Sequence, residues 1–336
     1  MTEPRGADPS GSEPDESLAV VTAIVLNWNH ATVTIGLLHS LETSFAQGIR
    51  AVVVDNGSVD NSVATLRSFL EQFRYGLQVE LIESSENLGF TGGVNLGVER
   101  ALAANASPEF ILLINPDGVA GPATVPVLLA AIRASGAGIM SYEVNQWALD
   151  AWPRVFYARP DNLLSRQILG AWRLNGSYAG ACVLFRSSLL RLLIAEDGHF
   201  QDPSLFFYWD EWDVSLRSRR LGALIAAAQG TSYRHEGDTR GLFNPHSPFR
   251  DYYSARNSVL VARRELSSRN FWTVFVVHLL RDVSWRLRLM TRGVRTPWRV
   301  YARGTWDGLR GESGRWDRHP LSPPPTIDEV PSGTDG

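Results

Sequence analysis

The sequence contains no lysine, and all 32 of its basic residues are arginine. Without lysine the chain cannot form a Schiff base with a carbonyl substrate or use the lysine of a phosphate-binding P-loop. Cys182 is the only cysteine, which excludes an internal disulfide and a zinc cluster built from cysteines. We interpret this thiol as a buried structural one. The lack of disulfides fits a reducing cytoplasm, where we expect the protein to act.

A strong charge of either sign and a long apolar run are also lacking. The formal net charge is −3, so the composition gives no indication of nucleic-acid binding. The apolar segment at residues 271–280 is too short to cross a bilayer. Residues 1–18 are rich in Pro, Gly, Ser and acids, with no basic and apolar pattern. We predict a disordered leader there, not a signal peptide, and a disordered tail at residues 317–336.

Apolar segments alternate with amphipathic ones along the first third of the chain. The β-branched and apolar runs at residues 19–27, 51–54, 77–84 and 110–115 predict strands, and residues 33–41, 63–73 and 94–104 predict helices. This alternation is typical of a doubly wound α/β sheet with mostly parallel strands. We expect one such domain over residues 19–265 and a helical extension over residues 266–316.

Polar motifs follow three of these predicted strands, in the order Asn27-Trp28-Asn29, Asp55-Asn56-Gly57-Ser58 and Asn115-Pro116-Asp117. Ligands of doubly wound sheets bind beyond the carboxyl ends of the strands, so the three motifs predict a shared crevice. Asp55 can accept hydrogen bonds from a ribose or a base, or simply cap its turn. Asp117 can hold Mg²⁺ or Mn²⁺, which prefer oxygen ligands and bridge phosphates, or simply end its strand.

The segment "ENLGFTGGVNLG" at residues 86–97 contains four glycines, which allow backbone amides to approach an anion. Their spacing differs from GxGxxG and argues against a nicotinamide-binding motif. A backbone loop near a nucleotide remains the functional interpretation. His235, in "SYRHEGD", is an isolated histidine that is either structural or, if it faces Asp117 across the crevice, a metal ligand.

The segment "FFYWDEWDVSLRSRRLG" at residues 206–222 places three carboxylates directly after four bulky apolar or aromatic residues. A helix N-terminus accounts for Asp213, which can pair with Arg217 four positions later. Asp210 and Glu211 are less simply explained. Apolar surroundings raise the pKa of a carboxyl group, as a general base requires.

Taken together, these motifs resemble the family 2 glycosyltransferases of the GT-A fold, and more narrowly the bacterial rhamnosyltransferase-type enzymes that build surface polysaccharides. The resemblance covers about residues 20–264. It rests on eight segments in the order of the family: "IVLNWNH", "VVVDNGSVDNS", "ENLGFTGGVNLG", "ILLINPDG", "GACVLFR", "FFYWDEWDVSLRSRRLG", "RHEG" and "YYSARN".

The resemblance implies roles for individual residues. Asp117 stands in place of the metal-binding Asp-x-Asp motif, and His235 can complete the metal shell around Mg²⁺ or Mn²⁺. Glu211 matches the catalytic base, with Asp210 as the rival because the acid pair here runs Asp-Glu where the family has Glu-Asp. The implied nucleotide-sugar residues are Asn27, Asn29, Asp55, Asn87, Gly92, Asn95, Asn115 and Asp117, and those on the acceptor side are Gly180, Ala181 and Trp209.

The resemblance therefore predicts an inverting transferase that moves a sugar from a nucleotide diphosphate sugar, with dTDP-rhamnose as one candidate, to a glycan or lipid-linked acceptor. Two alternatives stay open: a catalytically silent nucleotide- or glycan-binding relative, and a dinucleotide-dependent dehydrogenase. For the Arg- and Trp-rich residues 269–304 we predict contact with a membrane surface. The alternatives there are a helix packed on the domain and a homodimer contact.

Overall fold

The structure is a computed structural model that describes residues 21–44, 49–72, 76–104, 107–143, 168–169, 172–235, 247–291 and 298–316. The predicted leader at residues 1–18 and the predicted tail at residues 317–336 lie outside the described residues. Among the described helices, none combines the length and the apolar character needed to cross a membrane.

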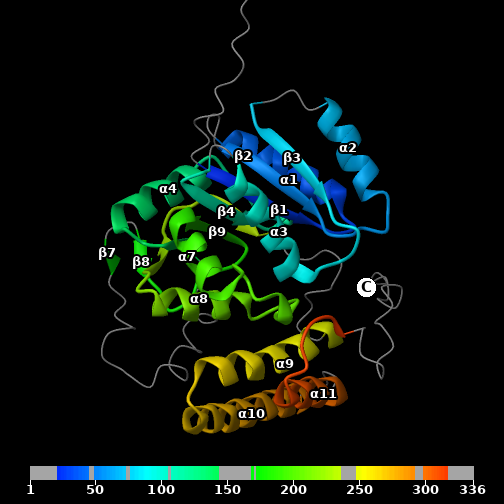
Figure 1. Cartoon of the computed structure of the whole chain (residues 1–336), viewed down its shortest axis with the longest axis vertical. Coiled ribbons are helices and arrows are strands. Elements are labelled where there is room, and N and C mark those ends of the chain that lie inside the picture. Colours follow the sequence, from blue (N-terminus) through cyan, green and yellow to red (C-terminus); the bar gives the residue numbers. More distant parts are fainter. Residues whose placement is uncertain are drawn as a thin grey trace, which may run out of the picture.

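A nine-stranded sheet with strand order β3-β2-β1-β4-β9-β6-β10-β8-β7 forms the centre of the molecule (Figure 1). Pairing is parallel along β3, β2, β1 and β4 and between β6 and β10, while β9 and β8 run opposite to their neighbours. The mostly parallel α/β sheet is therefore confirmed. The strands are β1 (Val21–Asn27), β2 (Ile49–Asp55), β3 (Gln78–Glu83), β4 (Phe110–Ile114), β6 (Ile139–Tyr142), β7 (Ile168–Leu169), β8 (Trp172–Leu174), β9 (Cys182–Arg186) and β10 (Ile225–Ala228).

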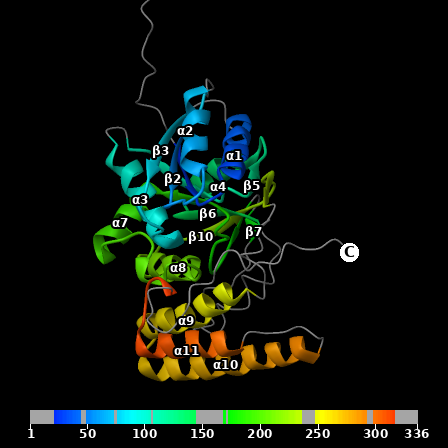
Figure 2. The same cartoon turned by 90° about the vertical axis from the view of Figure 1, so that its right-hand side faces the viewer.

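Helices cover both faces of the sheet (Figure 2). Successive residues of a strand point to opposite faces, and accordingly Ala23 and Val25 lie in one apolar cluster and Ile24 in another. The first cluster is completed by α1 (Ala31–Ser44), α2 (Ser62–Gln72) and α4 (Thr124–Ser135). The second is completed by α3 (Gly89–Ala103), α7 (Ser187–Asp197) and α8 (Asp210–Arg220). Burial on both faces explains why β1 and β4 are continuous apolar runs.

The glycine-rich segment differs from the prediction, because most of it belongs to α3, which begins at Gly89 and not near residue 94. The reason is close packing of this helix on the sheet. A Cβ on Gly97 would lie 2.7 Å from Ile24 Cγ2, and one on Gly93 would collide with Leu26. The contact of helix and sheet thus overrides the low helix propensity of glycine.

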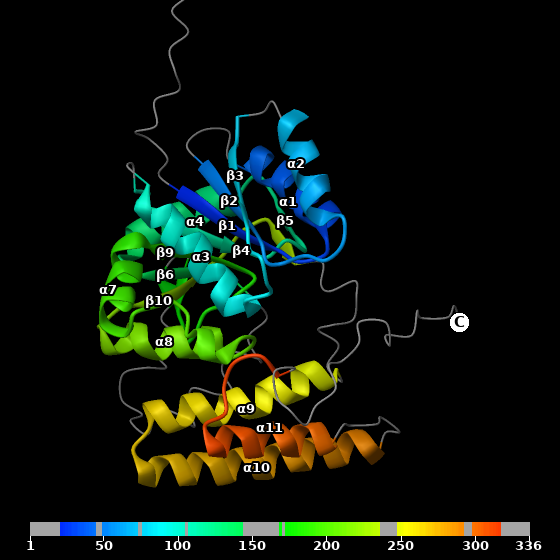
Figure 3. The ribbon, with the colours of Figure 1, turned by 45° about the vertical axis from the view of Figure 1, so that its right-hand side comes forward.

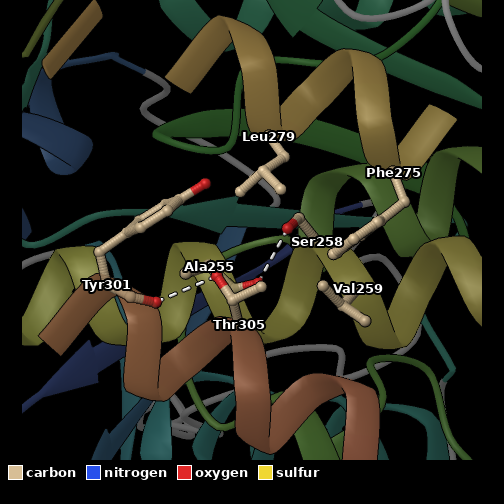
Figure 4. Close-up of a pocket in the computed structure, with 7 residues that line it drawn as sticks. All are labelled: Ala255, Ser258, Val259, Phe275, Leu279, Tyr301 and Thr305. Atoms are coloured by element: carbon tan, nitrogen blue, oxygen red, sulfur yellow. Dashed lines mark hydrogen bonds between the residues drawn. The ribbon is translucent and has the colours of Figure 1, made fainter. Parts of the chain in front are cut away.

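Three C-terminal helices form a separate layer beyond α8: α9 (Pro248–Glu265), α10 (Ser268–Thr291) and α11 (Trp298–Arg310) (Figure 1). Gly304 and Gly308 of α11 face backbone carbonyls of α9, so the two helices approach closely. The cleft between the three helices, lined by Ala255, Ser258, Val259, Phe275, Leu279, Tyr301 and Thr305, has room for about one water molecule (Figure 4). The domain limits at residues 18, 265 and 316 stay predictions.

Candidate active site

The ends of β1 and β2 are joined by a buried carboxylate. Asp55 accepts hydrogen bonds from Asn27 Nδ2 at 2.7 Å, from the Ser58 amide at 2.9 Å and from Ser58 Oγ at 2.7 Å. Asn29 has a positive φ of 51° and joins the same group, because its amide donates to Ser58 Oγ. Three predicted nucleotide-binding residues, Asn27, Asn29 and Asp55, therefore lie together at one edge of the sheet.

Asn56, part of the polar motif after β2 but not one of the predicted site residues, connects this edge to the start of α3. Its Nδ2 donates to the Gly89 carbonyl at 2.9 Å and to Asn87 Oδ1 at 3.2 Å, and its Oδ1 accepts from the Leu88 amide at 3.0 Å. Predicted site residue Asn87 is thereby held beside the β2 turn. The Asn-Gly pair at residues 56–57 was visible in the sequence, but only as a turn signal.

The N-terminus of α3 is closed by protein backbone. The Phe206 carbonyl accepts hydrogen bonds from the Phe90 amide at 2.7 Å and the Thr91 amide at 3.4 Å. Gly92 lies inside the helix. Asn95 Nδ2 donates to the Gln201 carbonyl at 2.7 Å, and Asn95 Oδ1 accepts from the Gln201 backbone amide at 2.8 Å. The described contacts of Gly92 and Asn95 are thus structural, and their predicted role toward a nucleotide remains a prediction that the geometry does not favour.

Asp117 and His235 meet through a small second sheet. The strands β5 (Gly118–Ala120) and β11 (Tyr233–His235) pair antiparallel with His235 opposite Gly118. His235 Nε2 lies 3.0 Å from Asp117 Oδ1. This hydrogen bond raises the pKa of His235 above its ordinary value. The condition set from the sequence, that His235 should face Asp117, is met.

Asp117 and His235 bring together a carboxylate oxygen, which suits Mg²⁺ and Mn²⁺, and an imidazole nitrogen, which is also a metal-binding atom. The 3.0 Å between Asp117 Oδ1 and His235 Nε2 is the length of the hydrogen bond that joins them in this structure. No group of three or more His, Cys, Asp or Glu suited to a metal exists within the described residues. Mg²⁺ and Mn²⁺ are commonly held by one or two protein side chains together with substrate phosphates.

The carboxylate pair lies at the first turn of α8, after a strained segment. Phe206, Tyr208 and Trp209 have φ values of 63°, 64° and 72°, which are uncommon for residues with bulky side chains and cost about 1–3 kcal/mol each. The predicted pair of Asp213 and Arg217 is present within α8, at 2.8 Å. Asp210 is buried and Glu211 is half-buried.

Burial changes the proton affinity of both acids. It raises the pKa of Asp210 well above the ordinary value, and the nearby charge of Glu211 raises it further. Burial also raises the pKa of Glu211, whereas a hydrogen bond from Asp210 lowers it. Both acids of the pair therefore hold a proton more tightly than an exposed carboxyl group does. The choice of Glu211 as the base, with Asp210 as the rival, stays a prediction.

Helix α9 holds the strained segment in place. Asn257 Nδ2 donates to the carbonyls of Leu205, Phe207 and Tyr208 at 2.9, 2.7 and 3.0 Å. Arg256, which is almost fully buried, donates to the Leu205 carbonyl at 2.9 Å. These contacts were missed from the sequence, although both residues lie in the quoted segment "YYSARN".

The segment that follows α11 reaches the same place. The Gly314 amide donates to the Ser204 carbonyl at 2.7 Å. Figure 3 shows this segment, in red, rising from the three-helix layer toward α8. The carboxylate pair is thus supported by residues from two distant parts of the chain.

The segment just before β9 lies next to Glu211 and next to the neighbours of Asp117 and His235. The Ala181 carbonyl accepts from the Asn115 amide and from Tyr233 Oη, both at 2.9 Å. A Cβ on Gly180 would lie 2.5 Å from Glu211 Oε1. Gly180 and Ala181 therefore lie between Asn115 and Glu211, and their acceptor-side role stays a prediction.

Two aromatic residues lie near the candidate site. Burial raises the pKa of Tyr142 to about 12, and the charges of Cys182, Asp117 and Glu211 add to the rise, which indicates that this phenol lies near both Asp117 and Glu211. Trp209, by contrast, packs with Leu205, Leu216 and Val259 between α8 and α9. It is 8% exposed, which leaves little of its surface for the predicted acceptor-side role.

One comparison with known proteins identifies a family, and another identifies the fold. Residues 22–193 match the family model described as glycosyl transferase family 2. The crystal structure of S. aureus TarS 1-349 in complex with UDP-GlcNAc is 16% identical, covers 87% of this chain and 81% of its own, and has a TM-score of 0.55. The mannosyltransferase PcManGT from Pyrobaculum calidifontis, in complex with GDP-Man and Mn²⁺, is 15% identical, covers 90% and 88%, and has a TM-score of 0.57. These likenesses show a shared fold. The comparison with curated proteins finds no match.

Proposed function

Because the chain belongs to glycosyltransferase family 2, we propose that it is an inverting enzyme that transfers a sugar from a nucleotide diphosphate sugar to a hydroxyl of a glycan or lipid-linked acceptor. The observation that carries the proposal is that Gly180 lies against Glu211, while Ala181 binds Asn115 and Tyr233, each two residues from the joined pair Asp117 and His235.

The donor side is formed by the strand ends. Asn27, Asn29 and Asp55 lie where the nucleoside is expected in a sheet of this kind. Asp117 and His235 would hold Mg²⁺ or Mn²⁺, and the bound ion would offset the negative charge of the leaving diphosphate. The relatives in complex with UDP-GlcNAc and with GDP-Man and Mn²⁺ support this class of donor. dTDP-rhamnose, the candidate from the sequence, stays one donor to be tested.

On the acceptor side, Glu211 accepts the proton of the acceptor hydroxyl. The oxygen of that hydroxyl bonds to the anomeric carbon as the proton leaves. The bond from that carbon to the diphosphate breaks at the same time, and the carbon is inverted because attack comes from the face opposite the leaving group. In this scheme we assign the proton of the acid pair to Asp210, whose burial raises its pKa well above the ordinary value, so that Asp210 can donate a hydrogen bond that orients the Glu211 carboxylate. A single base without a carboxylate nucleophile distinguishes this scheme from retaining hydrolysis.

Two measurements test the proposal. Thermal shifts with UDP-, GDP- and dTDP-sugars, with and without Mn²⁺, should show selective stabilisation by one nucleotide. Glu211→Gln should then lower kcat by about 100- to 10,000-fold while the donor-induced thermal shift persists. Unchanged turnover would remove Glu211 from the role of base. Donor binding without turnover of any sugar in the unmodified chain would favour the catalytically silent alternative.

The glycine-rich segment, whose spacing already argues against the dehydrogenase alternative, gives it no support in the structure either. Gly93 and Gly97 pack α3 against the sheet and Gly89 contacts Phe206.

A further inference from the structure

We propose that the outward face of α10 binds the surface of an anionic lipid bilayer. This face carries an apolar stripe, which we define as Trp272, Val276, Leu280, Leu287 and Met290. Each of the five side chains is about half exposed or more, with Leu280 the most exposed at 62%. At about 100° per residue, the five positions fall within an arc of about 80° around the helix. The stripe is therefore continuous along one side of α10.

The stripe cannot turn inward, because the other side of α10 is fixed to the protein. Phe271 and Phe275 pack in the cluster that contains Val259 of α9. Arg286 forms two hydrogen bonds with Asp251 of α9, at 2.8 and 3.0 Å. Tyr301 of α11 donates to Asp282 at 3.1 Å. Figures 1 and 2 both show α10 as the layer farthest from the sheet.

The arginines beside the apolar stripe indicate which kind of partner would bind there. Arg281 and Arg288 are exposed on the side of α10 that adjoins the stripe, and Arg299 is exposed on α11. Residues 266–316 contain ten arginines and three acids, whereas residues 1–265 contain 21 arginines and 28 acids. By sequence, residues 266–316 thus have an excess of seven positive charges and residues 1–265 an excess of seven negative ones. An apolar face flanked by arginine is typical of helices that lie in the headgroup region of anionic membranes.

A second copy of the chain fits this face less well. A two-fold interface would bring the same patch of both subunits together, and here it would oppose two faces that each carry the exposed Arg281 and Arg288. Such juxtaposed like charges are unfavourable. Anionic lipid, in contrast, matches both the arginines and the apolar stripe, and an exposed Trp272 suits the interfacial region.

If α10 lies on a bilayer, its position predicts what kind of acceptor the enzyme uses. This step rests on the proposed function. Helix α9 lies between α10 and the strained segment at residues 206–209. Packed helices lie about 8–10 Å apart, so a bilayer under α10 would be about two helix layers from the carboxylate pair. That arrangement favours an acceptor that is itself anchored in lipid.

Vesicle flotation tests the proposal with matched variants of the full chain. The first pair is Leu280→Ser with Leu287→Ser, compared with Leu192→Ser and Leu224→Ser, which change two similarly exposed leucines elsewhere. The second is Arg281→Gln with Arg288→Gln, compared with Arg100→Gln and Arg133→Gln. Vesicles contain either phosphatidylcholine alone or phosphatidylcholine with phosphatidylglycerol. Thermal unfolding of each variant reports whether the fold is retained.

The expected result is binding to the anionic vesicles at low ionic strength. The two leucine substitutions together should weaken vesicle binding at least about tenfold. The two arginine substitutions should weaken it about fivefold per arginine, and both control variants should bind as the unmodified chain does. High salt should remove the arginine effect. Absence of flotation with anionic vesicles at low salt would overturn the proposal. So would a stable dimer in sedimentation that the leucine pair converts to monomer, because the stripe would then belong to a second copy. Donor turnover, measured in parallel with a soluble acceptor, separates this outcome from a failure of the proposed function.

Discussion

The two sides of the candidate site are built in different ways. On the donor side, Asn27 and Asp55 stand at the ends of adjacent parallel strands, so the sheet itself brings them together. On the acceptor side, Asp210 and Glu211 follow a segment with three positive φ values, which is held by side chains of α9. The donor side therefore depends on the core of the fold, and the acceptor side depends on a separate helical layer. Changes to each side should have separable effects on donor binding and on turnover.

After Glu211→Gln, the largest effect is expected from Asp117→Asn on the donor side. Loss of the carboxylate charge should weaken the hold on a divalent ion and lower kcat/KM by about 100- to 1,000-fold. The additional thermal shift that Mn²⁺ gives with donor should disappear in the same variant. Glu99→Gln, which changes an exposed acid on α3, is the control. A variant that keeps both the Mn²⁺-dependent shift and the turnover would show that Asp117 only ends its strand.

Asn257→Ala should have the next largest effect, and on the other side. Three carbonyls of residues 205, 207 and 208 would lose their shared donor, which should lower the free energy of unfolding by about 2–4 kcal/mol. Displacement of the strained segment should lower kcat by about 10- to 100-fold, with the donor-induced thermal shift retained.

Ser258→Ala provides the control for this prediction, since that hydroxyl donates only to the Ala255 carbonyl of its own helix. If Asn257→Ala lost donor binding in proportion to turnover, the two sides would not be independent.

Gly180→Ala probes the junction of the two sides with a single methyl group. A Cβ there would meet Glu211 Oε1 at 2.5 Å, so the carboxylate must move, and kcat should fall about tenfold. Gly36→Ala is the matched control, because nothing lies within 4 Å of its added methyl. Its position within α1 should make that variant slightly more stable. Equal turnover in both variants would show that the position of Glu211 is not limiting.

The same contrast explains what the sequence could predict. Asn27 and Asp55 end apolar strands and Asp117 comes three residues after another, so the local pattern was sufficient to predict that they lie at one edge of a sheet. The partnership of Asp117 with His235 was only a conditional prediction, because the two residues are 118 positions apart and meet through the short strands β5 and β11. Strands of three residues leave almost no periodic signal.

The support of the acceptor side could not be predicted from the pattern. Asn257 and the carbonyls it binds are about 50 positions apart, and a side chain that binds distant backbone produces no periodicity. The glycine-rich segment gave a wrong prediction. Its composition indicates a loop, but packing against Ile24 and Leu26 makes it a helix.

The smallest effects are expected from the pH dependence of the acid pair. The Glu211 base acts when ionised, so kcat should fall as the pH drops through its raised pKa. Asp210→Asn keeps a hydrogen-bond donor beside Glu211, and the acid limb of the kcat profile should stay near its original position. Asp210→Ala removes the donor that lowers the pKa of Glu211, and the limb should move to higher pH. A limb that responds equally to both variants would contradict the assignment of the shared proton to Asp210.

Stability provides an independent measure of the same proton. Asp210 has a raised pKa in the folded state, so the folded chain binds this proton more tightly than the unfolded chain. Its contribution to stability is complete below the ordinary carboxyl pKa and is lost as the pH rises through the raised value. Asn is neutral at every pH, and Asp210→Asn should therefore flatten the stability profile and unfold at higher temperature than the unmodified chain at neutral pH. Thermal unfolding across this range, with Asp60→Asn at an exposed turn as the control, would show whether the acid pair costs stability that its chemistry requires.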